Sequence, residues 1–230
     1  MMQQTNEESL ELVCAAAFRG VHQAQVLYGQ MLLDGNLVER NPSAALHWFE
    51  RAAQGGNLMA VNMVGRCFDQ GWGVAKSVYM AEMWFRKAAE RGLDWGMYNL
   101  ATLLTLGEGD VPEDKLAAFH WFRKAADLGH VKSLNILGGF YEDGWVVSPD
   151  RTVARDYYRR AAIGGDFRGQ FNYARFLIHE GDLLGALHWL RQVPGTATPA
   201  FIHKMKEFLA TLSHPEIKDF ALSLAESPQS

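Results

Sequence analysis

Apolar residues recur along this chain with the spacing of an α-helix. In the stretch AVNMVGRCFDQG, which starts at Ala60, small and large apolar residues stand at offsets 0, 4, 5 and 8 from the first residue. The same offsets return from Ala24, Gly96, Ser133 and Gly169. Side chains at this spacing lie on one face of a helix. The pattern therefore predicts five helices of one kind, which we call A helices.

A second helical pattern alternates with the first. WFERAAQGG begins at Trp48, WFRKAAERG at Trp84, WFRKAADLG at Trp121 and YYRRAAIGG at Tyr157, so the steps are 36, 37 and 36 residues. A degenerate copy, WLRQVPG, begins 32 residues later at Trp189. We call the helices predicted from this pattern B helices. Self-similarity at such a period is typical of repeat proteins built from stacked helix pairs.

The two patterns divide the chain into repeats. An incomplete copy, CAAAFRG, predicts a half repeat at residues 6–20. Five helix pairs should follow at 22–56, 58–92, 94–129, 131–165 and 167–193. We expect the repeat array to occupy residues 1–197, a C-terminal helical cap 198–226 and a disordered tail 227–230. One helix pair cannot bury its own apolar face, so stability should come from contacts between neighbouring repeats.

The residues between the patterns explain where helices end and begin. Glycine is suited to the left-handed residue after a helix, and Asn, Ser or Asp to the residue that caps the next helix. The expected end residues of the A helices are Gly35, Gly71, Gly107 and Gly144. The expected N-caps of the B helices are Asn41, Ser77, Asp114 and Asp150.

Two further helices are expected at the C-terminal end. The first spans 199–212 after a cap at Thr198. The second begins with Ser213, Pro215 and Glu216, which have the spacing of a capping box with proline in the first turn. We predict that these helices cover the end of the stack.

The pattern A-x-x-x-L-G-x-x-Y, then G-x-G-V-x-x-D, then A-x-x-W-[FY]-R-K-A-A-E-x-G resembles the Sel1-like repeat, a relative of the tetratricopeptide repeat, over roughly residues 8–193. The resemblance implies an all-α, right-handed α-α superhelical solenoid of about five helix pairs, with an N-terminal half repeat and C-terminal capping helices. Departures occur in the loops, where Leu37 and Val146 replace the second glycine and Asp110 is inserted.

The resemblance also implies a function. Sel1-like proteins are generally adaptors, scaffolds or regulators that hold partner proteins. One branch is cysteine-rich, secreted and disulfide-linked and has been associated with β-lactam binding. This chain has only Cys14 and Cys67, so it lacks the paired cysteines of that branch.

By analogy with tetratricopeptide repeats, the A helices should line the concave side with offsets −1, 2, 3, 6 and 9. These offsets mix aromatic, amide and charged side chains, which suits an extended peptide or a partner helix. Two interpretations remain open for Tyr98, Asn99, Phe171 and Asn172, which could serve the scaffold or the partner. The candidate partner-binding residues are Asn62, Met63, Arg66, Asp69, Trp95, Tyr98, Asn99, Thr102, Asn135, Glu142, Phe171, Asn172 and Arg175.

Six of the seven tryptophans fall into two groups. The four at the B-helix position, Trp48, Trp84, Trp121 and Trp189, are predicted to be core residues. Two others, Trp72 and Trp145, occupy equivalent positions in the A–B loops. They are candidate loop anchors for a partner, or they pack on the next loop.

Composition limits the partners. The formal net charge is −4 and no block of like charge stands out, so we expect no nucleic acid as a partner. No run of about 18 apolar residues exists, which predicts no transmembrane helix. The N-terminal stretch lacks the basic and apolar regions of a secretory signal. Together with two free cysteines, this favours a cytoplasmic protein.

No catalytic or metal-binding motif emerges. His47, His120 and His188 share one repeat position, but the repeats between them carry Met83 and Asp156 there. About two repeats would separate successive histidines, too far for the ~2 Å bonds of a shared metal. No phosphate loop or nucleophile motif is present. We therefore expect no cofactor, no metal and no enzymatic activity.

The leading hypothesis is a non-catalytic protein–protein interaction module that holds a partner segment in the groove lined by the A helices. One alternative is an inhibitor or immunity-type protein that masks an effector enzyme. Another is a small-molecule-binding or hydrolytic Sel1-like protein, which would need a deep pocket with converging polar groups.

Overall fold

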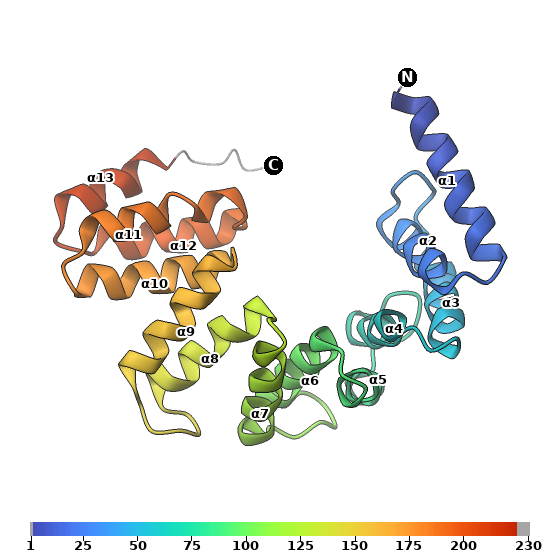
Figure 1. The fold of residues 1–230 in the computed structure, drawn as a ribbon, viewed down its shortest axis with the longest axis horizontal. Helices are drawn as coiled ribbons and strands as arrows, with labels where there is room; N and C mark the ends of the chain where they lie inside the picture. Colours follow the sequence, from blue (N-terminus) through green and yellow to red (C-terminus); the bar gives the residue numbers. More distant parts are fainter. Residues whose placement is uncertain (1, 225–230) are drawn as a thin grey trace. The chain divides into compact units, whose positions relative to one another are not determined.

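The fold consists of helices throughout. A computed structural model describes residues 2–224, and within that range it contains thirteen α-helices, one short 3₁₀ helix and no strand (Figure 1). This confirms the predicted all-α solenoid. The expected disordered tail at 227–230 lies outside the described residues. None of the helices in the described part is long and apolar enough to cross a membrane.

The helices alternate as the two patterns predict, and each A helix has thirteen residues. The A helices are α2 (His22–Asp34), α4 (Leu58–Gln70), α6 (Asp94–Leu106), α8 (Val131–Asp143) and α10 (Phe167–His179). The B helices are α1 (Met2–Phe18), α3 (Pro42–Gln54), α5 (Val78–Glu90), α7 (Lys115–Asp127), α9 (Arg151–Ile163) and α11 (Leu183–Leu190). The remaining elements are η1 (Val193–Gly195), α12 (Pro199–Ala210) and α13 (Pro215–Ser223).

The chain forms two compact units, which we call the N-terminal unit (Met1–Leu128) and the C-terminal unit (Gly129–Ser230). The N-terminal unit contains α1 to α7 and the C-terminal unit contains α8 to α13. Consecutive helices pack side by side from α1 to α7 in the N-terminal unit and from α8 to α11 in the C-terminal unit, where α12 packs on α13 and α13 on α11. Each unit thus holds at least two complete A–B pairs, which is enough for neighbouring repeats to share a core.

The predicted helix boundaries are confirmed at the loops. The four glycines after α2, α4, α6 and α8 are left-handed, with φ between 61° and 72°. The side chains of Asn41, Ser77, Asp114 and Asp150 accept hydrogen bonds from backbone N–H groups in the first turns of α3, α5, α7 and α9.

One loop uses a strained residue where its neighbours use glycine. Leu37 has a φ of 64°, close to the values of 72° and 62° at Gly73 and Gly109 in the next two loops. A leucine in this left-handed conformation costs about 1–2 kcal/mol relative to glycine. The first loop therefore keeps the repeat's backbone path at a local cost in stability.

The prediction that four tryptophans form the core is wrong for three of them. Only Trp48 is buried, and Trp84, Trp121 and Trp189 are half-buried. A cation one turn further along the helix covers the exposed side of two of these rings: Lys87 Nζ lies 4.9 Å from the centroid of Trp84, and Lys124 Nζ lies 4.4 Å from that of Trp121. Such amphipathic stacking keeps the indole at the edge of the core.

The fully enclosed aromatic ring is the one after the tryptophan position. Phe49, Phe85, Phe122 and Tyr158 are between 0% and 3% exposed. For three of the four rings, all but Phe122, a glycine of the preceding A helix makes room: a Cβ on Gly65 would lie 2.6 Å from Phe85, and one on Gly138 would lie against Tyr158. The close approach of A and B helices therefore depends on these glycines.

At the C-terminal end, one predicted cap is confirmed and the other is wrong. The Thr198 side chain accepts from the Phe201 N–H at the start of α12. The N-cap of α13 is His214 rather than Ser213, and its side chain makes no capping bond. Because Pro215 is itself the first helical residue, Ser213 lies one position too early to cap the helix. Four residues of α12 and α13 complete the core of the C-terminal unit: Met205, Leu209, Ile217 and Ala221.

Candidate functional site

The candidate site is the side-chain surface of the A helices, and we describe it for each unit separately. In the N-terminal unit it lies on α4 and α6. Asn62 and Met63 are only 2% and 4% exposed, and Met63 is part of the core. Arg66, Asp69, Tyr98, Asn99 and Thr102 are half-buried, and Trp95 is 37% exposed. We call these candidates the α4–α6 surface.

An asparagine pair joins α4 and α6, two neighbouring A helices of the N-terminal unit. Asn99 Nδ2 donates to Asn62 Oδ1 at 2.9 Å. One turn further along α6, the Thr102 hydroxyl donates to the backbone oxygen of Tyr98 at 2.9 Å, so its hydrogen bond is made within its own helix. The Tyr98 ring contacts Trp95 edge-on at 6.0 Å between centroids. The pair is therefore a local connection between repeats, with aromatic rings beside it.

The loop tryptophan of the N-terminal unit is attached to the same surface. The Arg66 guanidinium stacks over the half-buried Trp72 ring at 5.0 Å and also contacts Met63 Sδ at 3.6 Å. Asp69 accepts from the Gln70 amide at 2.6 Å. Arg66 is thus held against an aromatic face, which fixes the direction in which its charge is presented.

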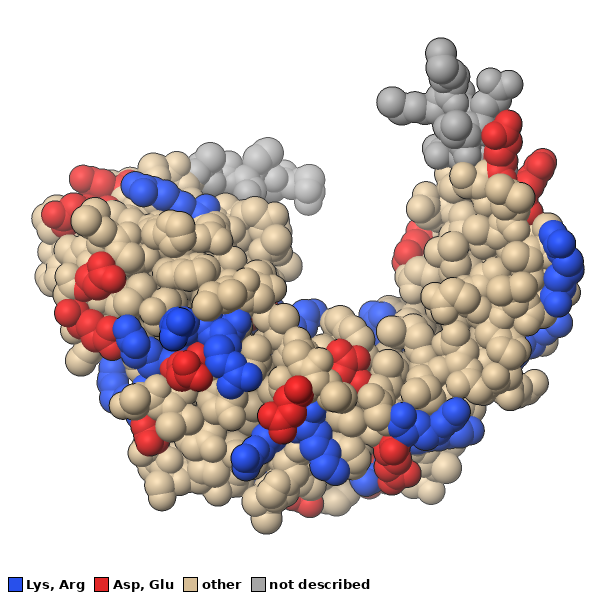
Figure 2. All heavy atoms as spheres, in the orientation of Figure 1, with Lys and Arg blue, Asp and Glu red and all other residues tan. Residues whose placement is uncertain are grey.

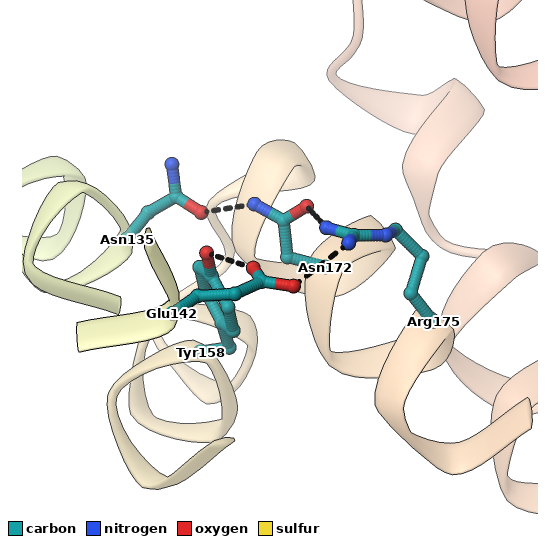
Figure 3. Close-up of polar contacts among 5 residues, drawn as sticks. All are labelled: Asn135, Glu142, Tyr158, Asn172 and Arg175. Carbon is teal, nitrogen blue, oxygen red and sulfur yellow. Dashed lines mark hydrogen bonds and ion pairs between the residues drawn. The ribbon is translucent and has the colours of Figure 1, made fainter. Parts of the chain in front are cut away.

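A longer polar network occupies the A helices of the C-terminal unit (Figure 3). Asn172 Nδ2 donates to Asn135 Oδ1 at 2.9 Å, which repeats the asparagine pair of the N-terminal unit. Arg175 then donates to Asn172 Oδ1 and to Glu142 Oε1, both at 2.9 Å. Tyr158 Oη donates to Glu142 Oε2 at 2.8 Å. These five residues, from α8, α9 and α10, form what we call the amide–arginine network.

The network lies at the boundary between core and solvent. The side chains of Arg175 and Glu142 are 31% and 21% exposed, whereas Tyr158 is buried. Burial, followed by the hydrogen bond to Glu142, raises the pKa of the Tyr158 hydroxyl above its usual range, so it stays a donor. Because Tyr158 donates to the same carboxylate, the half-buried ion pair of Arg175 and Glu142 is held in one geometry more firmly than an exposed ion pair would be.

Phe171, another candidate, faces the C-terminal helices of its own chain. Its ring lies 5.6 Å from Phe201 and 5.5 Å from Phe208, both on α12, in edge-to-face contacts. Arg168 stacks over Phe167 and Phe201, at 4.5 and 5.8 Å. The half-buried Phe171 ring is therefore engaged within the C-terminal unit.

The second candidate loop anchor is more exposed than the first. The Trp145 side chain is 49% exposed and its ring contacts Phe140 at 5.1 Å. It therefore presents part of an aromatic face to solvent, which Trp72 does to a smaller degree.

Sequence reasoning missed the part that Tyr158 takes in the network. The residue was assigned to the B-helix pattern alone, although its hydroxyl completes the coordination of Glu142. A signal was present: the equivalent positions hold Phe49, Phe85 and Phe122, so a hydroxyl is introduced at one repeat only. Lys132 and Arg168, both exposed, occupy offset −1, one of the positions expected to line the concave side, although they are not among the candidate residues.

Catalytic and metal-binding chemistry is not evident in the described part of the chain. Among the side chains that the structure describes, those of residues 8–224, no group of three or more His, Cys, Asp or Glu could hold a metal ion. Burial raises the pKa of the Cys67 thiol to about 12, so it stays protonated and unreactive. On the face shown in Figure 2, acidic and basic side chains are interspersed in both units.

The comparisons with known proteins agree with this arrangement. The sequence profile of the Sel1 repeat matches residues 22–57, 58–93, 96–130 and 131–166. A curated relative is chitin synthase regulatory factor 3 of Schizosaccharomyces pombe, which is 28% identical over 164 residues. That match covers 68% of this chain but only 17% of the regulatory factor, so the chain spans about a sixth of its relative.

Solved structures share the fold. A Sel1 repeat protein from Oxalobacter formigenes is 25% identical with a TM-score of 0.74, and the match covers 91% of this chain and 86% of that protein. An immunity protein from Pseudomonas aeruginosa is 16% identical with a TM-score of 0.59, covering 88% of this chain and 80% of that protein. The second match shows a common fold alone.

Proposed function

Because the chain belongs to the Sel1 repeat family, we propose that it is a non-catalytic interaction module that holds a segment of a partner protein against its A helices. The observation that carries this proposal is the chemistry of the A-helix side chains. They combine exposed aromatic rings, amides and fixed charges, including Trp95, Arg66 and Arg175. Such residues supply the anchors and the directed hydrogen bonds of peptide recognition.

The curated relative supports a regulatory role for the module. Its name describes a regulatory factor of an enzyme. A module of this kind acts by bringing a partner to a defined place rather than by reacting with it. Since the matched region is 17% of that relative, we carry over the class of activity and not its target.

Site-specific photo-crosslinking tests the proposal directly. A photoreactive phenylalanine analogue is placed at Trp95 or Lys132, both at offset −1 of an A helix. Matched controls carry it at Tyr79 or Thr152, which share one exposed position on the B helices α5 and α9. We expect the A-helix positions to cross-link a discrete protein when the purified chain is incubated with extract of its native host, and the B-helix positions not to.

The opposite distribution would contradict the proposal. Cross-links confined to Tyr79 and Thr152 would move the interaction to the B helices. Equal labelling at all four positions would show contact without a defined surface. Thermal melts of the four variants verify that each is folded.

A further inference from the structure

The amide–arginine network uses all of its own side-chain oxygens. Asn135 Oδ1 accepts from Asn172, Asn172 Oδ1 accepts from Arg175, and the two oxygens of Glu142 accept from Arg175 and Tyr158. Each of these oxygens keeps a further lone pair, but the one negative charge of the network, on Glu142, is already paired with Arg175. The network therefore offers a cationic ligand no unpaired charge.

Its donors, in contrast, are only partly used. The Asn135 Nδ2 group points away from the network, and within residues 2–224 no side chain or backbone group accepts from it (Figure 3). Arg175 has five N–H groups, and two hydrogen bonds account for two of them. Since the Arg175 side chain is 31% exposed, the others can meet a ligand.

Positive charge surrounds these donors. Lys132 on α8 and Arg168 on α10 are exposed. Both lie near the carboxyl group of Asp166, where their charges oppose the rise in its pKa that burial causes. Asp166 itself is 8% exposed and caps α10 through the Gly169 N–H at 2.7 Å. Of the carboxylates around these donors, Asp166 is buried and Glu142 is paired with Arg175, whereas Asp143 at the end of α8 is exposed.

The spacing of the arginines sets the length of a ligand. Arg168 and Arg175 are seven residues apart on α10, a rise of about 10.5 Å along the helix. Three residues of a peptide in the polyproline II conformation rise about 9 Å and return to the same side of the chain. In that conformation the first and last of four consecutive acidic residues would reach both guanidinium groups.

We propose that Lys132, Asn135, Arg168 and Arg175 form a binding surface for an acidic peptide segment. This deepens the proposed function, on which it rests, by naming the chemistry of the partner segment and placing it on the C-terminal unit. The segment's carboxylates and backbone carbonyls take the outward donors, and Glu142 holds the Arg175 guanidinium in position. The planar guanidinium of an arginine can pair bidentately with a carboxylate, which a lysine ammonium cannot do.

Fluorescence anisotropy with a labelled peptide tests the surface. The probe carries four consecutive glutamates between Gly-Ser flanks, and the comparison peptide carries four glutamines. We expect the glutamate peptide to bind, with an affinity that falls as salt is raised, and the glutamine peptide to bind at least about tenfold more weakly.

Substitutions localise the binding. Arg168→Gln and Arg175→Gln should each lower the affinity for the glutamate peptide about fivefold, because each removes one charge-assisted contact. Glu142→Gln keeps an oxygen for Arg175 and removes a negative charge, so it should strengthen binding about threefold. The matched control is Arg159→Gln on α9, an exposed arginine outside this surface, which should leave the affinity unchanged.

Three results would overturn the inference. Equal weakening by Arg159→Gln would show nonspecific charge attraction, and equal binding of the glutamine peptide would remove the role of carboxylates. Tighter binding of a single-stranded RNA of equal charge would favour nucleic acid. If the glutamate peptide fails while cross-links at Trp95 and Lys132 persist, this inference fails and the proposed function stands. Loss of those cross-links would contradict the proposed function, whatever the result with the glutamate peptide.

Discussion

The N-terminal unit and the C-terminal unit each carry one asparagine pair between neighbouring A helices, but the pairs have different surroundings. The hydrogen bond is the same, 2.9 Å from Asn99 to Asn62 and 2.9 Å from Asn172 to Asn135. In both pairs the two residues are 37 positions apart in the sequence. In the first unit the pair stands alone and its first member is buried. In the second unit it continues into an ion pair and a tyrosine hydroxyl.

Three equivalent positions account for the difference. The residue three places after the second asparagine is Thr102 in one unit and Arg175 in the other. The carboxylate at offset 9 of the preceding A helix is Asp69 or Glu142. The enclosed ring of the intervening B helix is Phe85 or Tyr158. The asparagine pair is common to both units and the residues around it differ, so we propose that these residues, rather than the pair, distinguish what the two surfaces bind.

The largest predicted effect on stability comes from removing the enclosed ring, and a smaller one comes from removing only the Tyr158 hydroxyl. Phe85→Ala and Tyr158→Ala should each lower the free energy of unfolding by about 3–5 kcal/mol, since both remove a ring that is at most 3% exposed. Tyr158→Phe keeps the ring and leaves one oxygen of Glu142 without its donor, which should cost about 1–2 kcal/mol. Urea unfolding followed by circular dichroism measures these changes. A Tyr158→Phe variant as stable as the wild type would show that the hydroxyl does not distinguish the units.

Exchanging the residue three places after the second asparagine, Thr102 or Arg175, should have a smaller effect on the free energy of unfolding. Arg175→Thr leaves Glu142, which is 21% exposed, without its cation and should cost about 1 kcal/mol. The reciprocal change, Thr102→Arg, puts a guanidinium beside Asn99 and Asp69 and should stabilise by about 0.5 kcal/mol or less. The same urea titrations give both values. If Thr102→Arg destabilises the chain, Asp69 is not the equivalent of Glu142 that its repeat position indicates.

Repeat period and cap chemistry predicted most of the fold. A single glycine or capping residue determines a local backbone conformation, so Gly71 and Asn41 could be identified from their types and spacing. The tryptophan assignment failed because period alone does not tell which of two adjacent aromatics points inward. That depends on the rotation of the helix, and at α5 the ring of Phe85, against Gly65, is the enclosed one.

The candidate surface was predictable as a set of positions but not as a set of contacts. Helical offsets placed Glu142, Asn172 and Arg175 on the A helices, yet their bonds depend on side-chain reach across two helices. Tyr158 was missed because its hydroxyl comes from a B helix. The contact of Phe171 with Phe201 and Phe208 was beyond prediction because α12 follows no repeat period that fixes its register.

The last prediction is a dependence on pH and concerns the caps that begin the A helices of the two units. Asn57 caps α4 in the N-terminal unit, and the buried Asp166 caps α10 in the C-terminal unit. Asn and Asp are about equally good caps, so Asp166→Asn should change stability by less than about 1 kcal/mol at neutral pH.

Burial raises the pKa of Asp166 above the ordinary value of 3.8. The folded chain therefore holds this proton to a higher pH than the unfolded chain does. The contribution of Asp166 to stability accordingly falls as the pH rises from 3.8 through its raised pKa. Asp166→Asn removes that dependence, so the variant should gain stability relative to the wild type as the pH rises, in urea titrations at several pH values from 4 to about 7. Asn57→Asp, at a half-buried cap, should produce a weaker dependence of the same sign as the wild-type Asp166. A stability difference between Asp166→Asn and the wild type that stays constant with pH would mean that burial does not distinguish the two caps.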